Sequence, residues 1–323
     1  MELLKNHLAT ARGIMSGLQP IWVISETFPG ESPGGFPPES RPNPVPHRIV
    51  IANQKGGVAK STTTINLARF LADRGQRVLI VDTDPQGSIA VALNIQPKHF
   101  LSDFVVRQLD FELCRTQVRD NLDLIASDRE TTKIEAMLNG SGVNVTAIFT
   151  LNTLFQPVEK QYDLILFDCA PSITSLQSSA LLYAQQMFIP VSMDMLAVYG
   201  AGACIQGANM MNSYWRDCAI RVIGFLPVMV DRRLQTTRVT MGLLEDLSKT
   251  ADAPILPPIR TDQSVHRASR ARRFLADHDP KSKALEDYCA AGTKLAELLH
   301  VKLSEPITTE PTAEETALEA SRA

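Results

Sequence analysis

A glycine-rich loop between an apolar segment and a helix-forming segment constrains this chain more than any other feature. The run Arg48-Ile49-Val50-Ile51-Ala52 is followed by Asn53-Gln54-Lys55-Gly56-Gly57-Val58-Ala59-Lys60-Ser61-Thr62. The first run is typical of a buried strand, and the residues from Ser61 onward are typical of a helix. In such a loop the backbone N–H groups and the helix N-terminus present partial positive charge. The sequence therefore predicts a loop that binds nucleotide phosphates.

The side chains of this loop match the chemistry of a P-loop. By that pattern Lys60 reaches the terminal phosphates, and the Ser61 hydroxyl binds Mg²⁺. The other nucleotide-binding residues that we expect are Lys55, Gly56, Gly57, Val58, Ala59 and Thr62. Lys55 is unusual, because an ordinary P-loop has no lysine of fixed identity ahead of its glycines. The expected ligands are therefore a nucleotide and Mg²⁺.

Composition limits the classes of protein that the chain can belong to. Its 323 residues, 44% hydrophobic and 21% charged, suit one large globular α/β domain or two small ones. A net charge of −3 gives no global attraction to nucleic acid or membrane, so any such affinity must come from a local patch. The five cysteines form no CxxC pair, which favours reduced thiols in the cytoplasm. We expect neither a membrane span nor a signal peptide.

Strand and helix patterns alternate from Arg48 onward, which predicts an α/β fold with a doubly wound, mostly parallel sheet. The expected strands are 48–52, 77–82, 122–126, 162–168, 187–191, 221–228 and 255–259. The expected helices are 61–74, 131–138, 175–184, 199–214, 237–248 and 283–299. Together with the glycine-rich loop, these segments indicate one P-loop domain over residues 48–303.

The two ends of the chain differ from this domain in composition. Residues 1–47 include seven prolines and three glycines between Pro29 and Pro46, which predicts a flexible, proline-rich N-terminal extension. Residues 304–323 hold five glutamates and one arginine with few large apolar side chains. We expect this segment to be an acidic, disordered tail.

Two of the expected strands end in aspartates. The first continues into Asp82-Thr83-Asp84-Pro85-Gln86-Gly87, and the second into Asp168-Cys169-Ala170-Pro171-Ser172. Ligands of an α/β sheet lie at the carboxyl ends of its strands. Because burying a carboxylate there is costly, Mg²⁺ on a triphosphate is a natural reason to place one.

These motifs together resemble those of the ParA/MinD ATPases over residues 48–300. Lys-Gly-Gly-x-x-Lys-Ser-Thr resembles their deviant Walker A motif, Val-Asp-x-Asp-Pro-Gln-Gly their second signature, and Phe-Asp-Cys-x-Pro-Ser their Walker B strand end. Asn53-Gln54-Lys55 and Asp84-Pro85-Gln86-Gly87 resemble the ParA branch in particular. The resemblance implies a P-loop NTPase fold of the deviant Walker A type.

The resemblance also implies a role for each matching residue. Lys55 would cross to the phosphates of a partner subunit in an ATP sandwich dimer, and Lys60 would hold phosphates in cis. Asp84 would position the attacking water, which with these two lysines completes the expected catalytic set. Mg²⁺ would be held by Ser61, Asp82 and Asp168, partly through water.

Two positions depart from the family pattern. Ala59 stands where the family most often has glycine, and if the backbone there needs a positive φ, alanine costs about 1 kcal/mol. Ala170 replaces a frequent proline in the Walker B turn. Neither departure removes a functional group, so we expect ATP binding to survive.

A basic segment near the C-terminus is a candidate DNA-binding surface. Residues 260–273 carry five arginines against one acid. On a helix Arg267 and Arg270 share a face, which Arg273 extends, and Arg260 falls where ParA-like proteins place a basic residue used for DNA. Such arginines contact phosphates without reading bases. A solvated helix face is the alternative interpretation.

The function implied by the resemblance is an ATPase that dimerises with ATP, binds nonspecific DNA and partitions plasmid or chromosome DNA. Hydrolysis would be slow and stimulated by a ParB-like activator protein, and the protein would be cytoplasmic and nucleoid-associated. A close variant positions some other cargo.

Other members of the wider group remain as alternatives. A MinD-like membrane-associated switch needs a basic amphipathic C-terminal helix, whereas the tail here is acidic, so we expect no stable membrane insertion. An iron–sulfur ATPase needs cysteines in glycine-rich loops, which Cys114 and Cys169 do not have around them. A non-hydrolysing scaffold would not need Asp84. An N-terminal helix-turn-helix domain does not fit the short, proline-rich residues 1–47.

Overall fold

A computed structural model describes residues 45–139, 149–172, 174–215 and 218–305. The predicted extension over residues 1–47 and the predicted tail over 304–323 lie outside these ranges, apart from residues 45–47 and 304–305. No helix in the described ranges is both long and apolar enough to cross a bilayer.

The core of the fold is a seven-stranded sheet with the order β3-β4-β2-β5-β1-β6-β7. Its strands are β1 (His47–Ile51), β2 (Val78–Asp82), β3 (Arg115–Arg119), β4 (Leu122–Ile125), β5 (Leu164–Asp168), β6 (Gln186–Ser192) and β7 (Arg221–Val228). Every pairing between neighbours is parallel except β3 with β4, which is antiparallel. The predicted doubly wound, mostly parallel α/β fold is confirmed.

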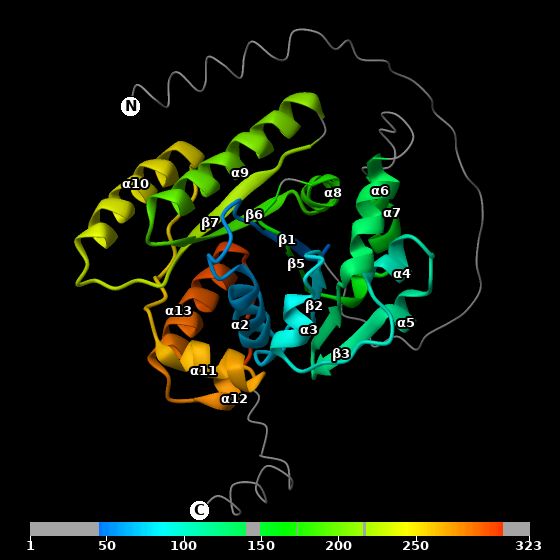
Figure 1. Cartoon of the computed structure of the whole chain (residues 1–323), viewed down its shortest axis with the longest axis horizontal. Helices are drawn as coiled ribbons and strands as arrows, with labels where there is room; N and C mark the ends of the chain where they lie inside the picture. The colour runs from blue at the N-terminus through cyan, green and yellow to red at the C-terminus, as the bar shows by residue number, and fades with distance from the viewer. Residues whose placement is uncertain (1–44, 140–148, 173, 216–217, 306–323) are drawn as a thin grey trace, which may run out of the picture. The chain divides into compact units, whose positions relative to one another are not determined.

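Helices cover both faces of this sheet, and Figure 1 shows α2 and α13 on one side with α8, α9 and α10 on the other. The helices are α2 (Lys60–Ala72), α3 (Ser88–Ala92), α4 (Leu101–Val105), α5 (Phe111–Cys114), α6 (Thr132–Asn139), α7 (Thr150–Phe155), α8 (Ser175–Ala184), α9 (Met195–Tyr214), α10 (Gln235–Ala251), α11 (Gln263–Ala271), α12 (Leu275–His278) and α13 (Lys283–Leu298).

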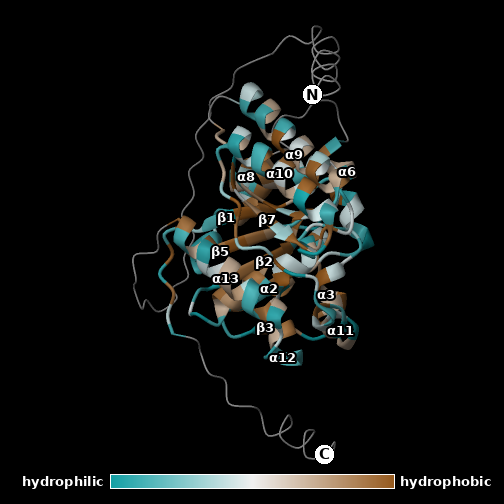
Figure 2. Cartoon of the chain, turned by 90° about the vertical axis from the view of Figure 1, so that its left-hand side faces the viewer, coloured by the Kyte–Doolittle hydropathy of each residue, from teal (hydrophilic) through white to brown (hydrophobic). Residues whose placement is uncertain are grey.

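Alternate residues along the strands pack into two separate hydrophobic cores. In β1, Val50 packs on the α8–α9 side, whereas Ile49 and Ile51 pack on the α2–α13 side. Because side chains of a strand alternate between faces, a strand covered by helices on both sides must be apolar throughout. Figure 2 shows the result as a hydrophobic sheet between helices whose outer surfaces are more hydrophilic.

Strand register brings the ends of three strands together. Ile51, the last residue of β1, pairs with Asp168 of β5, and Asp82 of β2 pairs with the same aspartate. The glycine-rich loop leaves the end of β1 at this edge. The fold therefore gathers the loop and both strand-end aspartates at one place.

Two details of the predicted sheet are wrong. Residues 255–259 do not form a strand, and only isolated bridges link Ile255 to Phe225 and Arg260 to Val230. Three prolines (Pro254, Pro257 and Pro258) lack the N–H that a strand ladder requires, which explains the failure. Strand β3 was not expected, because its mixed polar sequence has little apolar alternation.

Candidate nucleotide-binding site

The glycine-rich loop enters α2 through a left-handed backbone turn. Ala59 precedes the first residue of α2 with φ 56° and ψ 33°, and its carbonyl accepts a hydrogen bond from Thr63 N at 2.8 Å. Gly57 has φ 75°. The backbone at Ala59 does adopt a positive φ, so this alanine occupies a conformation that costs an L-residue about 1 kcal/mol. Gly56 and Gly57 are exposed, and a Cβ added at either would meet nothing within 4 Å.

Asn53 ties the start of the loop to α9. Its buried side-chain amide donates to the carbonyls of Pro190 (2.9 Å) and Ala197 (3.1 Å), while its Oδ1 accepts from Lys55 N at 2.9 Å. Gly200 makes this packing possible, because an added Cβ would collide with Asn53 Oδ1 and lie 3.0 Å from Lys55 N. Sequence reasoning missed this support, for which the only signal was a polar residue directly after a buried strand.

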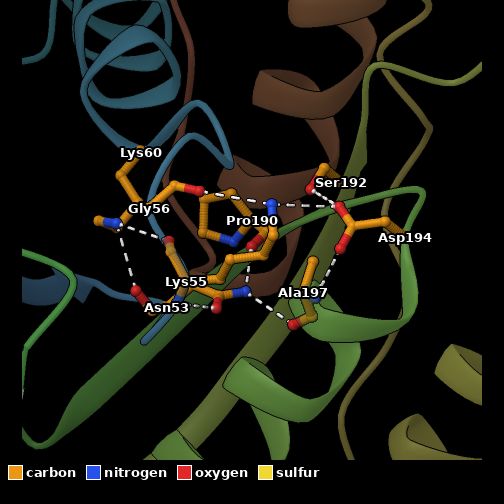
Figure 3. A network of polar contacts seen from close by, with 8 residues as sticks. All are labelled: Asn53, Lys55, Gly56, Lys60, Pro190, Ser192, Asp194 and Ala197. Atoms are coloured by element: carbon orange, nitrogen blue, oxygen red, sulfur yellow. Dashed lines mark hydrogen bonds and ion pairs between the residues drawn. The ribbon is translucent and has the colours of Figure 1, made fainter.

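Lys60 lies beneath the loop and points into it (Figure 3). Its Nζ donates to the carbonyls of Asn53 and Lys55, each at 3.2 Å. Burial lowers the pKa of Lys60, and the charge of Asp168 opposes that shift. The loop therefore holds a largely buried cation against its own backbone, as expected for the lysine that would bind phosphates in cis.

Lys55 lies on the other side of the loop and is more exposed than Lys60. Figure 3 shows its ammonium directed at Asp194, the N-cap of α9, with Nζ 3.4 Å from Oδ2. Asp194 also accepts from Ser192 Oγ (2.7 Å) and from Ala197 N (3.0 Å). Neither Asp194 nor Ser192 was among the residues that the sequence indicated.

The strand-end aspartates lie in the interior, and one of them has an unused oxygen. Asp168 is fully buried, and its Oδ1 accepts from Thr64 Oγ1 at 3.0 Å. Its Oδ2 makes no hydrogen bond to any residue that the structure describes. Burial raises the pKa of Asp168 to about 6, although the Ser61 and Thr64 hydroxyls and Lys60 oppose that shift.

Asp82 gives this corner a second carboxyl. It is fully buried, and burial together with the charge of Asp168 raises its pKa well above the ordinary value. Two adjacent buried carboxyls with an unbonded oxygen are unfavourable without a cation. Because Mg²⁺ takes oxygen ligands and keeps several waters, Ser61, Asp82 and Asp168 fit such an ion.

Asp84 follows Asp82 in a tight turn and is half-buried. Its N–H donates to Asp82 Oδ1 at 3.0 Å, and its own Oδ1 accepts from Gln86 N at 3.0 Å. Gly87 closes the turn with φ 59°, where an added Cβ would lie 2.6 Å from the Ser127 carbonyl oxygen. The charge of Asp84, like that of Asp168, opposes the lowering of the pKa of Lys60.

The predicted DNA-binding arginines divide into two groups. Arg260 is held by Asp287, which accepts from its backbone N (2.9 Å), Nε (2.7 Å) and Nη2 (2.6 Å). Arg267 and Arg270 are exposed on α11, and Arg273 is exposed just after that helix. Arg260 is therefore tied to Asp287, whereas α11 carries the exposed residues Arg267 and Arg270.

A cavity of about 580 Å³ lies between the end of β7 and the loop that follows residues 254–259. It is lined by Val230, Asp231, Arg232, Arg233, Pro258, Arg260, Thr261, Gln263 and Asp287. Sequence reasoning missed this cavity, because its walls come from segments about 30 residues apart that the fold brings together.

Comparisons with known proteins agree with this architecture. A family model described as an AAA domain matches residues 47–217. The sporulation initiation inhibitor protein Soj of Bacillus subtilis is 28% identical over 253 residues, which are 77% of this chain and 97% of Soj. The chromosome partitioning protein ParA of Myxococcus xanthus is 29% identical over 258 residues, covering 76% of this chain and 87% of that protein.

A solved structure has the same fold. The ATP complex of a single-residue variant of Cyanothece McdA superposes with a TM-score of 0.69, covering 80% of this chain and 99% of that one at 19% identity. The sheet order, the glycine-rich loop with two lysines and the paired strand-end aspartates fit the same assignment. This chain belongs to the ParA family of deviant Walker A, P-loop ATPases.

Proposed function

We propose that this protein is a Mg²⁺-dependent ATPase that forms a homodimer with ATP and binds nonspecific DNA as that dimer. The observation that carries the ATPase assignment is the buried Asp168 Oδ2, which lacks a donor although Ser61, Thr64 and Lys60 act on the same carboxylate. An acceptor left unbonded in the interior costs about 1–3 kcal/mol, which a bound cation with its waters would recover. Family membership supports ATP hydrolysis in general.

Each residue of the site would have its own role in the reaction. The backbone N–H groups of the exposed residues Gly56 and Gly57 would bind phosphate oxygens. Lys60 would exchange its carbonyl partners for those oxygens. Mg²⁺, held by Ser61 and by Asp82 and Asp168 partly through water, would neutralise phosphate charge when bound. Asp84 would orient the attacking water from the turn after β2.

The place of Lys55 supports the proposed dimer. Its side chain lies at the rim of the loop, so a second copy facing this edge of the sheet would bring its phosphates within reach. A lysine supplied in trans stabilises charge on the transferred phosphoryl group and makes hydrolysis depend on assembly. Slow turnover of this kind suits a timer that a ParB-like activator protein accelerates.

DNA binding is assigned to α11 and the residue just beyond it. Arg267 and Arg270 on α11 and Arg273 just after it are exposed residues. Arg260, whose side chain binds Asp287, is not assigned to this surface. Contacts of this type bind the phosphate backbone of any sequence and weaken steeply with salt. We propose that the dimer doubles this surface, is cytoplasmic and nucleoid-associated, and moves plasmid or chromosome DNA.

The deciding experiment measures binding to an arbitrary DNA duplex with ATP, with ADP and without nucleotide over a salt series. We expect binding only with ATP and Mg²⁺, and affinity that falls steeply as salt rises. Lys55→Ala should abolish both the ATP dimer and DNA binding, whereas Arg267→Glu with Arg270→Glu should abolish DNA binding alone. Failure of the wild type to bind DNA in any state, with binding to anionic liposomes instead, would replace this proposal with a membrane switch.

A further inference from the structure

The contact between Lys55 and Asp194 has a consequence for the proposed dimer. Within a single chain Asp194 holds the same ammonium group that has to reach the phosphates of the second copy. Resting on the proposed function, we infer that Asp194 is a positioning residue that retains Lys55 in cis and so opposes ATP-driven dimerisation. Release of Lys55 would then be part of forming the dimer.

The surroundings of Asp194 keep its carboxylate in place whether or not Lys55 is bound. Oδ1 caps α9 through Ala197 N at 3.0 Å, and Oδ2 accepts from Ser192 Oγ at 2.7 Å while facing Lys55 Nζ at 3.4 Å (Figure 3). Burial acts to raise the pKa of Asp194, but these hydrogen bonds and Lys55 together lower it. The carboxylate is therefore charged at neutral pH and fixed at the helix start.

Lys55, in contrast, is held weakly on its own side. Its Nζ has a carbonyl contact with Gly56 at 3.5 Å, the outer limit of a hydrogen bond, besides the ion pair. The side chains of Lys55 and Asp194 are 31% and 42% exposed. An ion pair with this exposure contributes little to stability, so Lys55 can leave Asp194 for a phosphate. Because both protomers lose the pair on dimerisation, its free energy opposes the dimer twice.

The same contact joins the loop to α9. Asn53 fixes the loop to the Ala197 carbonyl, in the first turn of the helix that Asp194 caps. Release of Lys55 from Asp194 leaves the hydrogen bond from Asn53 to Ala197 and the cap on α9 intact. Asp194 can therefore change the reach of Lys55 without displacing the phosphate-binding backbone, which separates its effect on dimerisation from any effect on nucleotide affinity.

The test compares wild type, Asp194→Asn and Ser192→Ala in sedimentation velocity with Mg²⁺ and a non-hydrolysable ATP analogue. Asparagine keeps the helix cap but removes the charge that holds Lys55. We expect Asp194→Asn to tighten the dimer between about twofold and thirtyfold, since one exposed ion pair is lost in each of two protomers. Nucleotide affinity of the monomer should stay within about twofold. Ser192→Ala removes the hydrogen bond to Oδ2 but keeps the charge of Asp194, so it should tighten the dimer less than Asp194→Asn does.

Salt provides a readout that a merely structural role would not change. Because the ion pair is screened, the advantage of Asp194→Asn over wild type should shrink as salt rises from about 50 to about 500 mM, a range in which the Debye length falls from about 14 to about 4 Å. A dimer of Asp194→Asn that is no tighter than wild type, or an advantage that persists at high salt, overturns the inference.

A second measurement separates this inference from the proposed function. The double-mutant cycle of Lys55→Ala and Asp194→Asn, followed by urea unfolding without nucleotide, reports the contact in the monomer alone. If the cycle shows coupling between Lys55 and Asp194 but wild type forms no dimer with ATP, the proposed dimer is refuted. The regulatory role of Asp194 is refuted with it. A wild-type dimer with no coupling in the cycle would refute the retention of Lys55 only.

Discussion

Replacement of Asp168 by asparagine should stabilise the protein while abolishing the proposed binding of Mg²⁺. Asp168 is fully buried at the end of β5 beside Asp82, and no donor in the described chain reaches its Oδ2. Asparagine has nearly the same shape, and its Oδ1 can still accept the hydrogen bond from Thr64. The substitution therefore removes a charge and little else.

The expected gain follows from the pKa of the native carboxyl. An increase in the pKa of Asp168 from 3.8 to about 6 corresponds to about 3 kcal/mol against its charged form at neutral pH. The asparagine amide placed at Oδ2 leaves N–H groups without a partner, which costs about 1 kcal/mol. We expect Asp168→Asn to raise the free energy of unfolding by about 2 kcal/mol at pH 7 without nucleotide.

Urea unfolding over a pH series tests this electrostatic cause. Because the native carboxyl of Asp168 binds a proton more tightly than the unfolded one, its unfavourable contribution to wild-type stability should disappear as pH falls from about 6 toward 4. The gap between Asp168→Asn and wild type should therefore close over that range. Asp246→Asn is the matched control, since that side chain is 78% exposed on α10 and should change stability by less than about 0.5 kcal/mol.

Addition of Mg²⁺ and ATP should make wild type more stable than Asp168→Asn. A ligand at a hundred times its dissociation constant stabilises by about 2.7 kcal/mol, a gain that Asp168→Asn should largely lose. The electrostatic explanation is refuted if Asp168→Asn is less stable than wild type without nucleotide at pH 7. It is refuted equally if the gap between the two proteins does not depend on pH.

Three further substitutions test other parts of the structure. Ala59→Gly should raise the free energy of unfolding by about 0.5–1 kcal/mol in urea, because it relieves a left-handed alanine. Gly200→Ala should weaken ATP binding at least tenfold in calorimetry by pushing on the loop, whereas Gly207→Ala, on the same helix with open space around it, should leave ATP binding unchanged. In a thermal melt Arg260→Ala should lower Tm more than Arg267→Ala, since only Arg260 forms the paired contact described above; equal Tm values would contradict that role.

The order of the site's elements along the chain could be predicted from local sequence. The run at 48–52, the loop at 53–59 and the helix from Lys60 have distinct local preferences, and both strand-end aspartates follow strands that are apolar throughout. Because a parallel sheet places the carboxyl ends of its strands at one edge, such a sequence already predicts where loop and carboxylates meet. The positive φ of Ala59 could likewise be posed as a question from sequence alone.

Contacts between distant segments were decided only by the tertiary structure. Asp194 lies 139 positions after Lys55, and nothing in Ser192-Met193-Asp194 distinguishes a capping aspartate from one that also holds a lysine. The engagement of Arg260 by Asp287 is of the same kind, since their spacing of 27 residues has no periodic meaning. Local preference fixes which elements form and what they end in, whereas the partner of a charged side chain depends on how the elements pack, because the Coulomb energy of a pair is set by its separation in space and by its exposure to water.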